Sequence, residues 1–294
     1  MEIFSEFAVA TPVGRDVAVL AAVPERPARA LVTVLPAMGV PARFYRALAA
    51  ALCRRGHLVA VVNLPGQGAS PLRIRRGVDL RYDDLVDQDI RATARHLREA
   101  YPSRPLVLLG HSLGGHLALR YASRPGVDVA GVALMACGSV WFRSFGVRRG
   151  LLNLLCSQLF VALARVVGHW PGDRLRFGGR QPTGVLGDWA AQVRSGDMTG
   201  GGGGRAFTCR SPVLLVSVDN DRLAPPRAVR YLTAAIPDAP VERWHYAESA
   251  AGGALDHFRW AKRPEALAAR IDDWMARAAS TCPSDTTDGM DRDC

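Results

Sequence analysis

Lysine is almost absent from this chain of 294 residues. Lys262 is the single lysine, and arginine supplies every other basic side chain of a chain whose formal net charge is +10. The basic residues form no run interleaved with aromatics, and no motif of a nucleic-acid-binding fold is present. We therefore expect no nucleic-acid partner, whereas an acidic partner or an anionic substrate stays open.

Cysteine is also scarce and unpatterned. The six cysteines include no CxxC pair and have no regular spacing, which excludes a disulfide framework and a structural zinc site. The first seven residues, MEIFSEF, carry acidic side chains where a signal peptide carries basic ones, and they lack a long apolar core. The expected location is cytoplasmic.

No apolar run is long and uninterrupted. The most apolar stretch, Leu151 to Gly168, is broken by Asn153, Ser157, Gln158 and Arg165. A membrane-spanning helix needs about 20 residues with few polar interruptions. We predict a buried helix or a lid helix here, and no stable membrane span.

Strand-like and helix-like segments alternate over most of the chain, which has a globular composition with 49% hydrophobic and 22% charged residues. This alternation predicts an α/β fold with a mostly parallel central sheet flanked by helices. The expected strands are 2–10, 16–23, 30–35, 58–63, 105–110, 129–136, 212–218 and 240–246. The expected helices are 42–55, 81–101, 116–122, 225–236 and 264–279.

The alternation stops between Ser139 and Gly200. This segment holds seven aromatic residues, eight arginines and three aspartates, which favours a helical cap inserted over the sheet. Five consecutive glycines, Gly200 to Gly204, lack the Lys-Ser/Thr of a phosphate loop and are typical of a linker. We therefore predict a core formed by 1–138 and 205–279, a cap with its linker at 139–204, and a disordered tail at 280–294.

The most informative stretch is Gly110-His-Ser-Leu-Gly114, which lies between an apolar strand and a helical segment. In this context Gly-x-Ser-x-Gly predicts a sharp strand-to-helix turn with Ser112 at its apex. Glycines two residues before and after the serine avoid side-chain clashes in such a turn. The serine hydroxyl would project above the strand beside the positive end of the helix.

With this motif the chain resembles the α/β-hydrolase superfamily, in its serine-hydrolase branch of lipases, esterases, thioesterases and serine aminopeptidase-like proteins. The resemblance extends over most of residues 30–277 and implies a catalytic triad in the chain order serine, acid, histidine. A serine hydroxyl needs a base to remove its proton, and the base needs a carboxylate to orient it.

Five of the seven histidines precede every plausible acid, so His245 and His257 remain as candidate bases. His257 comes after a glycine-bearing loop and before the last helix, which is where the superfamily holds its base; His245 lies inside a strand pattern, so we favour His257. The five earlier histidines are expected at surface or helix positions (His57, His96, His111, His116 and His169).

The acid is expected just after the strand 212–218. In the superfamily the acid precedes a short apolar pair and a proline. By this similarity Asp221 is the acid, and Asp219 is the alternative. Either residue could instead cap a turn. Asp256 is disfavoured because it is adjacent to His257, and adjacent side chains on an extended chain point in opposite directions.

The resemblance also implies two backbone amides that stabilise the oxyanion. One is Leu113, directly after the serine, and the other falls in Leu35-Pro-Ala-Met-Gly39, where position matching selects Met38. The usual His-Gly pair of the family is Pro36-Ala37 here. A second departure, Asn63 to Ser70, is interpreted as a structural turn without a catalytic role.

These residues predict a serine hydrolase that cleaves an ester or thioester of an apolar acyl group through an acyl-enzyme on Ser112. The alternatives are an acyltransferase that uses the same triad and a non-catalytic ligand-binding protein on this fold. No metal or organic cofactor is required. The partner is a small-molecule acyl substrate, or an acidic acyl-carrier protein if cap arginines bind it (Arg143, Arg148, Arg149, Arg174, Arg176 and Arg180).

Overall fold

The computed structural model describes residues 3–199 and 206–281. Within that part of the chain the main sheet has eight strands in the order β1-β2-β4-β3-β5-β6-β9-β10. Their bounds are β1 Phe4–Ala10, β2 Asp16–Ala22, β3 Leu31–Leu35, β4 Leu58–Val62, β5 Leu106–His111, β6 Gly131–Met135, β9 Val213–Val218 and β10 Val241–Tyr246. Each expected strand is present within about two residues of its predicted limits.

The sheet is parallel except at one edge. The leading pair β1 and β2 is antiparallel, and β2 pairs antiparallel with β4; all the remaining pairs are parallel. The carboxyl ends of β3, β5, β6 and β9 therefore meet at one edge of the sheet, where ligands bind in open α/β folds. The predicted α/β class and the mostly parallel sheet are confirmed.

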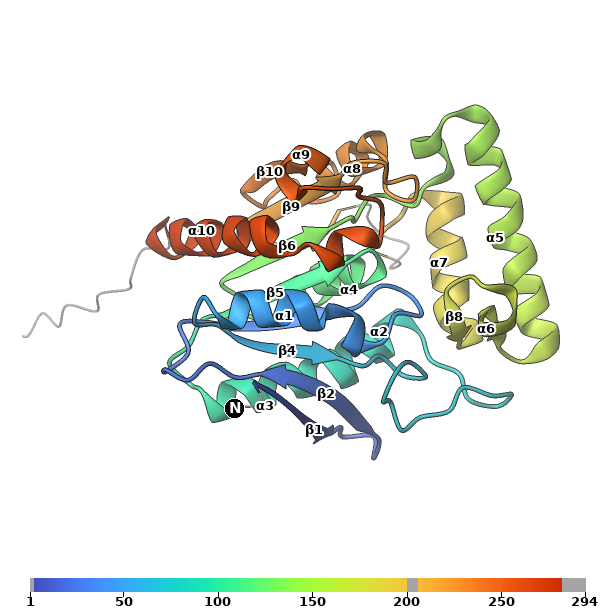
Figure 1. Ribbon diagram of the computed structural model, residues 1–294. Helices are drawn as coiled ribbons and strands as arrows, with labels where there is room; N and C mark the ends of the chain where they lie inside the picture. The colour runs from blue at the N-terminus through green and yellow to red at the C-terminus, as the bar shows by residue number, and fades with distance from the viewer. Residues whose placement is uncertain (1–2, 200–205, 282–294) are drawn as a thin grey trace, which may run out of the picture.

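Helices cover both faces of the sheet (Figure 1). Successive residues of β3 point to opposite faces: Leu31 and Leu35 belong to one buried cluster, and Val32 and Val34 to the other. One face is covered by the segment Tyr82–Ala100 (α2 Tyr82–Asp84, the π-helical η2 Leu85–Ile90 and α3 Arg91–Ala100), by α4 Leu113–Ala122 and by α8 Pro226–Thr233. The other face is covered by η1 Ala42–Tyr45, α1 Arg46–Cys53, α9 Glu248–Ala251, η4 Arg259–Lys262 and α10 Glu265–Thr281.

Between β6 and β9 the chain leaves the sheet and forms a separate layer at one end of the molecule (Figure 1). This layer, called the cap below, is not purely helical, because β7 and β8 pair antiparallel. Its own small core includes Trp170, Leu186 and Ala190. Its elements are η3 Phe142–Phe145, α5 Val147–Val167, β7 Trp170–Pro171, α6 Gly172–Leu175, β8 Gly179–Gln181 and α7 Thr183–Ser195.

The structure contradicts one of the two predictions for helix α5. It is not a buried helix, because most of its large apolar side chains face outward and only 22% of its most apolar window is buried. The alternative, a lid helix, stays a prediction. By length and composition alone it is the one helix, in the described part of the chain, that could cross a membrane. The polar residues that argued against a membrane span lie within this helix, but they do not lower its mean hydropathy enough to exclude a span by length and composition.

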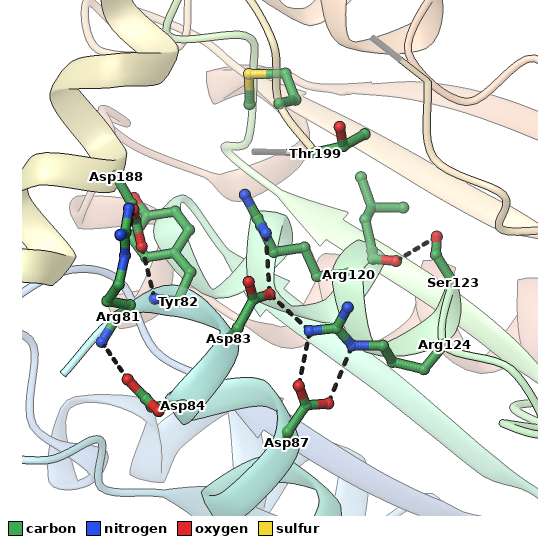
Figure 2. Close-up of polar contacts among 12 residues, drawn as sticks. Arg81, Tyr82, Asp83, Asp84, Asp87, Arg120, Ser123, Arg124, Asp188 and Thr199 are labelled. Carbon is green, nitrogen blue, oxygen red and sulfur yellow. Dashed lines mark hydrogen bonds and ion pairs between the residues drawn. The ribbon is translucent and has the colours of Figure 1, made fainter. Parts of the chain in front are cut away.

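The cap is attached to the core at α2. Asp188 on α7 accepts a hydrogen bond of 2.9 Å from the backbone N–H of Tyr82 and pairs with the guanidinium of Arg81 (Figure 2). A second attachment joins the backbone N–H of Gly184 to the carboxylate of Asp79 at 2.7 Å. The α2 end of the long helical segment therefore carries one side of the cap.

The last helix extends beyond its predicted limit. The tail was expected to start at Ser280, but α10 continues through Thr281. The rest of that tail, residues 282–294, and the predicted linker Gly200–Gly204 lie outside the described residues. The four cysteines recorded in the described part, Cys53, Cys137, Cys156 and Cys209, are all free.

Candidate active site

Ser112 occupies the apex of a sharp turn between β5 and α4. Its backbone angles are φ 52° and ψ −115°, a conformation that a residue with a side chain rarely adopts. The turn is held because the N–H of Ser112 donates to the carbonyl of Met135 at 3.1 Å, and its carbonyl accepts from Gly115 at 2.9 Å. Such strain persists only where the surrounding structure enforces it, and it is concentrated at functional sites.

The glycines around this serine are required by close packing. A Cβ at Gly114 would lie 2.0 Å from the carbonyl oxygen of Leu35, and one at Gly110 would lie 2.4 Å from the Cα of Gly115. The helix can therefore start directly against the end of β3 only if both positions lack a side chain. This is the physical reason for the motif.

His257 and Asp221 form a buried pair. The ring Nδ1–H of His257 donates to the two carboxylate oxygens of Asp221 at 3.0 and 2.9 Å. The carboxylate also accepts backbone hydrogen bonds of 2.8 Å from Leu223 and Ala224, which hold it in one orientation. Because Nδ1 is bonded to Asp221, Nε2 is the nitrogen available to another group.

Ser112 and His257 line the same cavity of about 340 Å³. Among the hydrogen bonds of residues 3–199 and 206–281, none joins the Ser112 hydroxyl to the imidazole ring. Catalytic hydrogen bonds in enzymes without substrate are often long and shorten when the substrate binds. The structure brings all three predicted triad residues to this one location.

The alternative acid and base are elsewhere and pair with each other. Asp219 accepts a hydrogen bond from His245 Nε2 at 2.9 Å, and the other ring nitrogen of His245 bonds to the hydroxyl of Ser217 at 2.8 Å. The backbone N–H of Glu248, and then His245, lower the pKa of the exposed Asp219. The side chains of Asp219, His245 and Ser217 do not line the cavity. Asp256, the disfavoured candidate, instead accepts from the N–H groups of Phe258 and Arg259.

The two predicted oxyanion donors both line the cavity. Leu113 is the first residue of α4, so its N–H has no acceptor within the helix. Met38 follows β3, in a loop whose Ala37 N–H already donates to the hydroxyl of Tyr45 at 2.9 Å. Met38 therefore remains the candidate for the second amide.

The segment Asn63 to Ser70, interpreted from the sequence as a structural turn, also contacts the loop that contains Met38. The side-chain oxygen of Asn63 accepts from Ala42 at 3.0 Å and from Ala69 at 3.3 Å. With its amide oriented to satisfy its neighbours, Gln67 donates to the carbonyl of Val40 and accepts from Gly39, both at 3.2 Å. The segment thus stabilises the loop that contains Met38 through hydrogen bonds to the residues after it. These contacts join segments far apart in the chain, so the sequence alone did not predict them.

His111 was expected at a surface or helix position, and that expectation is wrong. It ends β5, is fully buried, and shares a hydrogen bond of 2.9 Å with the Tyr45 hydroxyl through Nδ1. Its Nε2–H donates to the carbonyl of His257 at 3.0 Å. Burial holds the pKa of His111 well below its usual range, so the ring is neutral and links the Ala37 loop to the His257 backbone. Its place directly before Ser112 in the motif was the available sequence signal.

His57 and His116 are buried as well, and His57 pairs with Asp272 at 3.0 Å. Only His116 of these two lines the cavity.

Few of the cap's aromatic residues reach the cavity. Phe177 and Trp189 line it, whereas Trp170 packs against Phe160 and Phe177 inside the cap, and Trp141 packs against Tyr231. Most of the remaining wall is apolar, with residues such as Met38, Leu113, Val140 and Leu223.

The cap arginines are mostly used in contacts within the protein. Arg180 pairs with Asp173 at 2.9 Å, and Arg149 donates to the carbonyl of Arg222. Arg143 lies against the rings of Trp141 and Phe142. Of the six arginines considered as anion-binding residues, Arg176 is the one that lines the cavity. Within the described residues, no group of three or more His, Cys, Asp or Glu side chains is arranged to hold a metal ion.

Comparisons with known proteins support the fold. Residues 26–167 match the family described as serine aminopeptidase, S33. A lipase in its open form superposes with a TM-score of 0.66 at 18% identity, over 94% of this chain and 99% of that chain. A thermostable carboxyl esterase from Bacillus coagulans gives a TM-score of 0.65 at 16% identity, over 95% and 99%. The thioesterase domain from the curacin biosynthetic pathway gives 0.57 at 18%, over 94% and 100%.

No curated protein sequence matches the chain significantly. The sheet order and the solved structures agree on the α/β-hydrolase fold. Residues 26–167, which include the serine turn, are similar to the serine aminopeptidase family.

Proposed function

We propose that the protein is a serine hydrolase that cleaves an ester or thioester of an apolar acyl group through an acyl-enzyme on Ser112. The observation that carries the proposal is the buried His257–Asp221 pair, whose imidazole lines the same cavity as a serine in a strained turn. The apolar wall of that cavity favours an acyl chain over a charged group.

Each residue has a distinct task in this reaction. His257 Nε2 accepts the hydroxyl proton while Ser112 Oγ attacks the carbonyl carbon, and Asp221 stabilises the imidazolium that forms. The N–H groups of Met38 and Leu113 donate to the oxyanion of the tetrahedral intermediate. The proton then passes from His257 to the leaving alcohol or thiol. Water, deprotonated by His257, cleaves the acyl-enzyme and releases the acid.

A fluorophosphonate probe tests the nucleophile, because it forms a stable bond only with an activated serine. We expect a single label on Ser112, located by peptide mass spectrometry, and none on the Ser112→Ala variant. Ser217→Ala is the matched control, since Ser217 contacts a histidine–aspartate pair outside the cavity. It should label as the wild type does. A folded wild-type protein that is not labelled at Ser112 would refute the proposal.

The same proteins, assayed with p-nitrophenyl esters of rising chain length, test the acyl group. Medium-chain esters should be cleaved faster than the acetate, because a longer chain buries more apolar surface in the cavity. A preference for acetate would contradict the apolar pocket.

A further inference from the structure

A buried chain of hydrogen bonds connects the loop that contains Met38 with the backbone of His257. The N–H of Ala37 donates to the hydroxyl of Tyr45 at 2.9 Å, and this hydroxyl lies 2.9 Å from Nδ1 of His111. The other ring nitrogen of His111, Nε2, lies 3.0 Å from the carbonyl oxygen of His257. The four linked residues have exposed fractions of at most 5%, so solvent has little access to these hydrogen bonds.

The groups in this chain fix the direction of every hydrogen bond. A carbonyl oxygen can only accept, so Nε2 of His111 carries a proton. Burial holds the pKa of His111 well below its usual range, so the ring is neutral and its Nδ1 has a lone pair. The Tyr45 hydroxyl accepts from Ala37 and donates its own proton to that lone pair. Each donor therefore has an acceptor, and the chain has one consistent arrangement.

The two ends of the chain adjoin groups that act in the proposed reaction. Ala37 directly precedes Met38, whose N–H is the candidate for the second oxyanion donor, and His257 is the candidate base. The carbonyl of His257 accepts a second hydrogen bond of 2.9 Å, from Nε1 of Trp260. Two donors thus hold the main chain of the base, while Asp221 orients its ring.

His111 also adjoins the nucleophile. It directly precedes Ser112, and the centre of its ring lies 5.0 Å from the centre of the His257 ring. A positive charge at this distance would oppose the imidazolium that forms on His257 during the reaction. The hydrogen bond from Tyr45 requires the lone pair of Nδ1, so it favours the neutral ring that does not oppose this charge.

We propose that Tyr45 and His111 are positioning residues, whose hydrogen bonds hold the oxyanion donor and the base at a fixed separation around Ser112. This inference rests on the proposed function, because it assigns a task in that reaction to two residues outside the triad. Neither residue lines the cavity, so both act through the groups that they hold. A displacement of about 1 Å in a catalytic group can lower the rate about a hundredfold.

Tyr45→Phe tests the chain because it removes one oxygen atom and keeps the packed ring. It leaves the Ala37 N–H and the His111 Nδ1 without their common partner. With p-nitrophenyl octanoate we expect kcat to fall about tenfold to a hundredfold, while KM changes by less than about twofold. The loss falls on kcat because the oxyanion and the imidazolium form only during the reaction, whereas the acyl chain contacts the cavity wall before it.

Tyr246→Phe is the matched control. This tyrosine is also fully buried, and its hydroxyl donates a hydrogen bond to the carbonyl of Arg263. Both variants should lower the melting temperature, because each loses a buried hydrogen bond, but only Tyr45→Phe should lower kcat. Equal kcat values in the two variants would show that Tyr45 contributes to stability alone, and would overturn the proposal.

His111 is tested by two variants that differ in hydrogen bonding. His111→Gln keeps an amide that can donate to the His257 carbonyl, whereas His111→Leu has no polar atom. We expect kcat to be about fivefold to tenfold higher in His111→Gln than in His111→Leu, the effect of one neutral hydrogen bond. Tyr45→Phe should cost less in the His111→Leu background than in the wild type, because the chain is already broken. Losses that simply multiply would mean that the two residues act independently, and would overturn the chain.

A measurement without turnover separates this inference from the hydrolase proposal. In Ser112→Ala labelled with ¹⁵N, the NMR signals of the Met38 amide and of the His257 ring report on the two ends of the chain. Adding Tyr45→Phe should shift both signals, and adding Tyr246→Phe should shift neither. Shifts at both ends support the chain even if the wild type cleaves no ester. A His257 signal that does not move overturns the chain, and ester cleavage by the wild type then leaves the hydrolase proposal standing.

Discussion

At the scale of single residues, two aspartates only two positions apart have opposite environments. Asp221 is buried against His257, and Asp219 is exposed against His245. The residue between them, Asn220, has a φ of 57°, which turns the chain so that the two side chains diverge. Sequence similarity selected Asp221, but the physical distinction between the two carboxylates depends on this turn.

The two aspartates therefore make a matched pair of variants. Asp221→Asn should lower kcat for a p-nitrophenyl ester by a factor on the order of 10³ to 10⁴, because an amide neither fixes the required tautomer of His257 nor stabilises the imidazolium. Asp219→Asn should retain nearly all of the activity. Equal losses in the two variants, or a loss in Asp219→Asn alone, would mean that the acid is misassigned.

At the scale of elements, the cap and the core share the wall of the cavity. Helix α7 contributes Trp189, and the segment before β8 contributes Phe177 and Gly178. A Cβ at Gly39 would lie 2.4 Å from the backbone of Gly178, so this segment packs directly on the loop that contains Met38. The position of the cap is thus coupled to the loop that contains Met38 as well as to Tyr82.

The Asp188 contact in Figure 2 makes this coupling testable. Asp188→Ala removes the acceptor of the Tyr82 N–H, and we expect the free energy of unfolding to fall by about 1–2 kcal/mol. Asp188→Asn keeps an acceptor oxygen and loses only the pairing with the exposed Arg81, so its loss should be below about 1 kcal/mol. Urea denaturation measures both.

We also expect KM to rise more in Asp188→Ala than in Asp188→Asn, because Tyr82 and α7 both border the cavity. Equal stability in the two variants would show that the hydrogen bond to the backbone contributes nothing.

At the scale of the whole molecule, the most unusual surface is the outer side of α5. Five apolar residues recur there at intervals of four, and each is more than a third exposed (Val147, Leu151, Leu155, Leu159 and Leu163). Arginines flank this stripe near both ends of the helix, at Arg148, Arg149 and Arg165. Continuous apolar surfaces of this kind are uncommon on monomeric soluble proteins.

Replacing Leu151, Leu155 and Leu159 together by Gln should barely change the stability, because each substitution at an exposed position costs within about 0.5 kcal/mol. Binding of a non-ionic detergent should fall at the same time, since the apolar stripe is interrupted. Leu186→Gln, in the buried core of the cap, is the contrasting control and should destabilise the protein by about 2–5 kcal/mol. A large loss of stability in the triple variant would mean that these leucines are covered in solution.

Local pattern determined much of this protein. The alternation of apolar strands and amphipathic helices predicts the sheet, because strand and helix periods are properties of short segments. The Gly-x-Ser-x-Gly turn is local too, and the glycines that permit it are visible in the sequence. Chain order and similarity were enough to select Ser112, Asp221 and His257.

The tertiary structure alone decided what surrounds those residues. Whether a histidine is buried depends on what packs against it. The burial of His111 beside β6 and the hydrogen bond of His116 to the Gly138 carbonyl both involve segments distant in the chain, so the sequence did not predict them. The exposed face of α5 could not be predicted either. An apolar helix is expected to be buried, and here no other element of the described chain covers that face. Periodicity records which groups share a face, but hydrogen-bond satisfaction and burial depend on segments far apart in the chain.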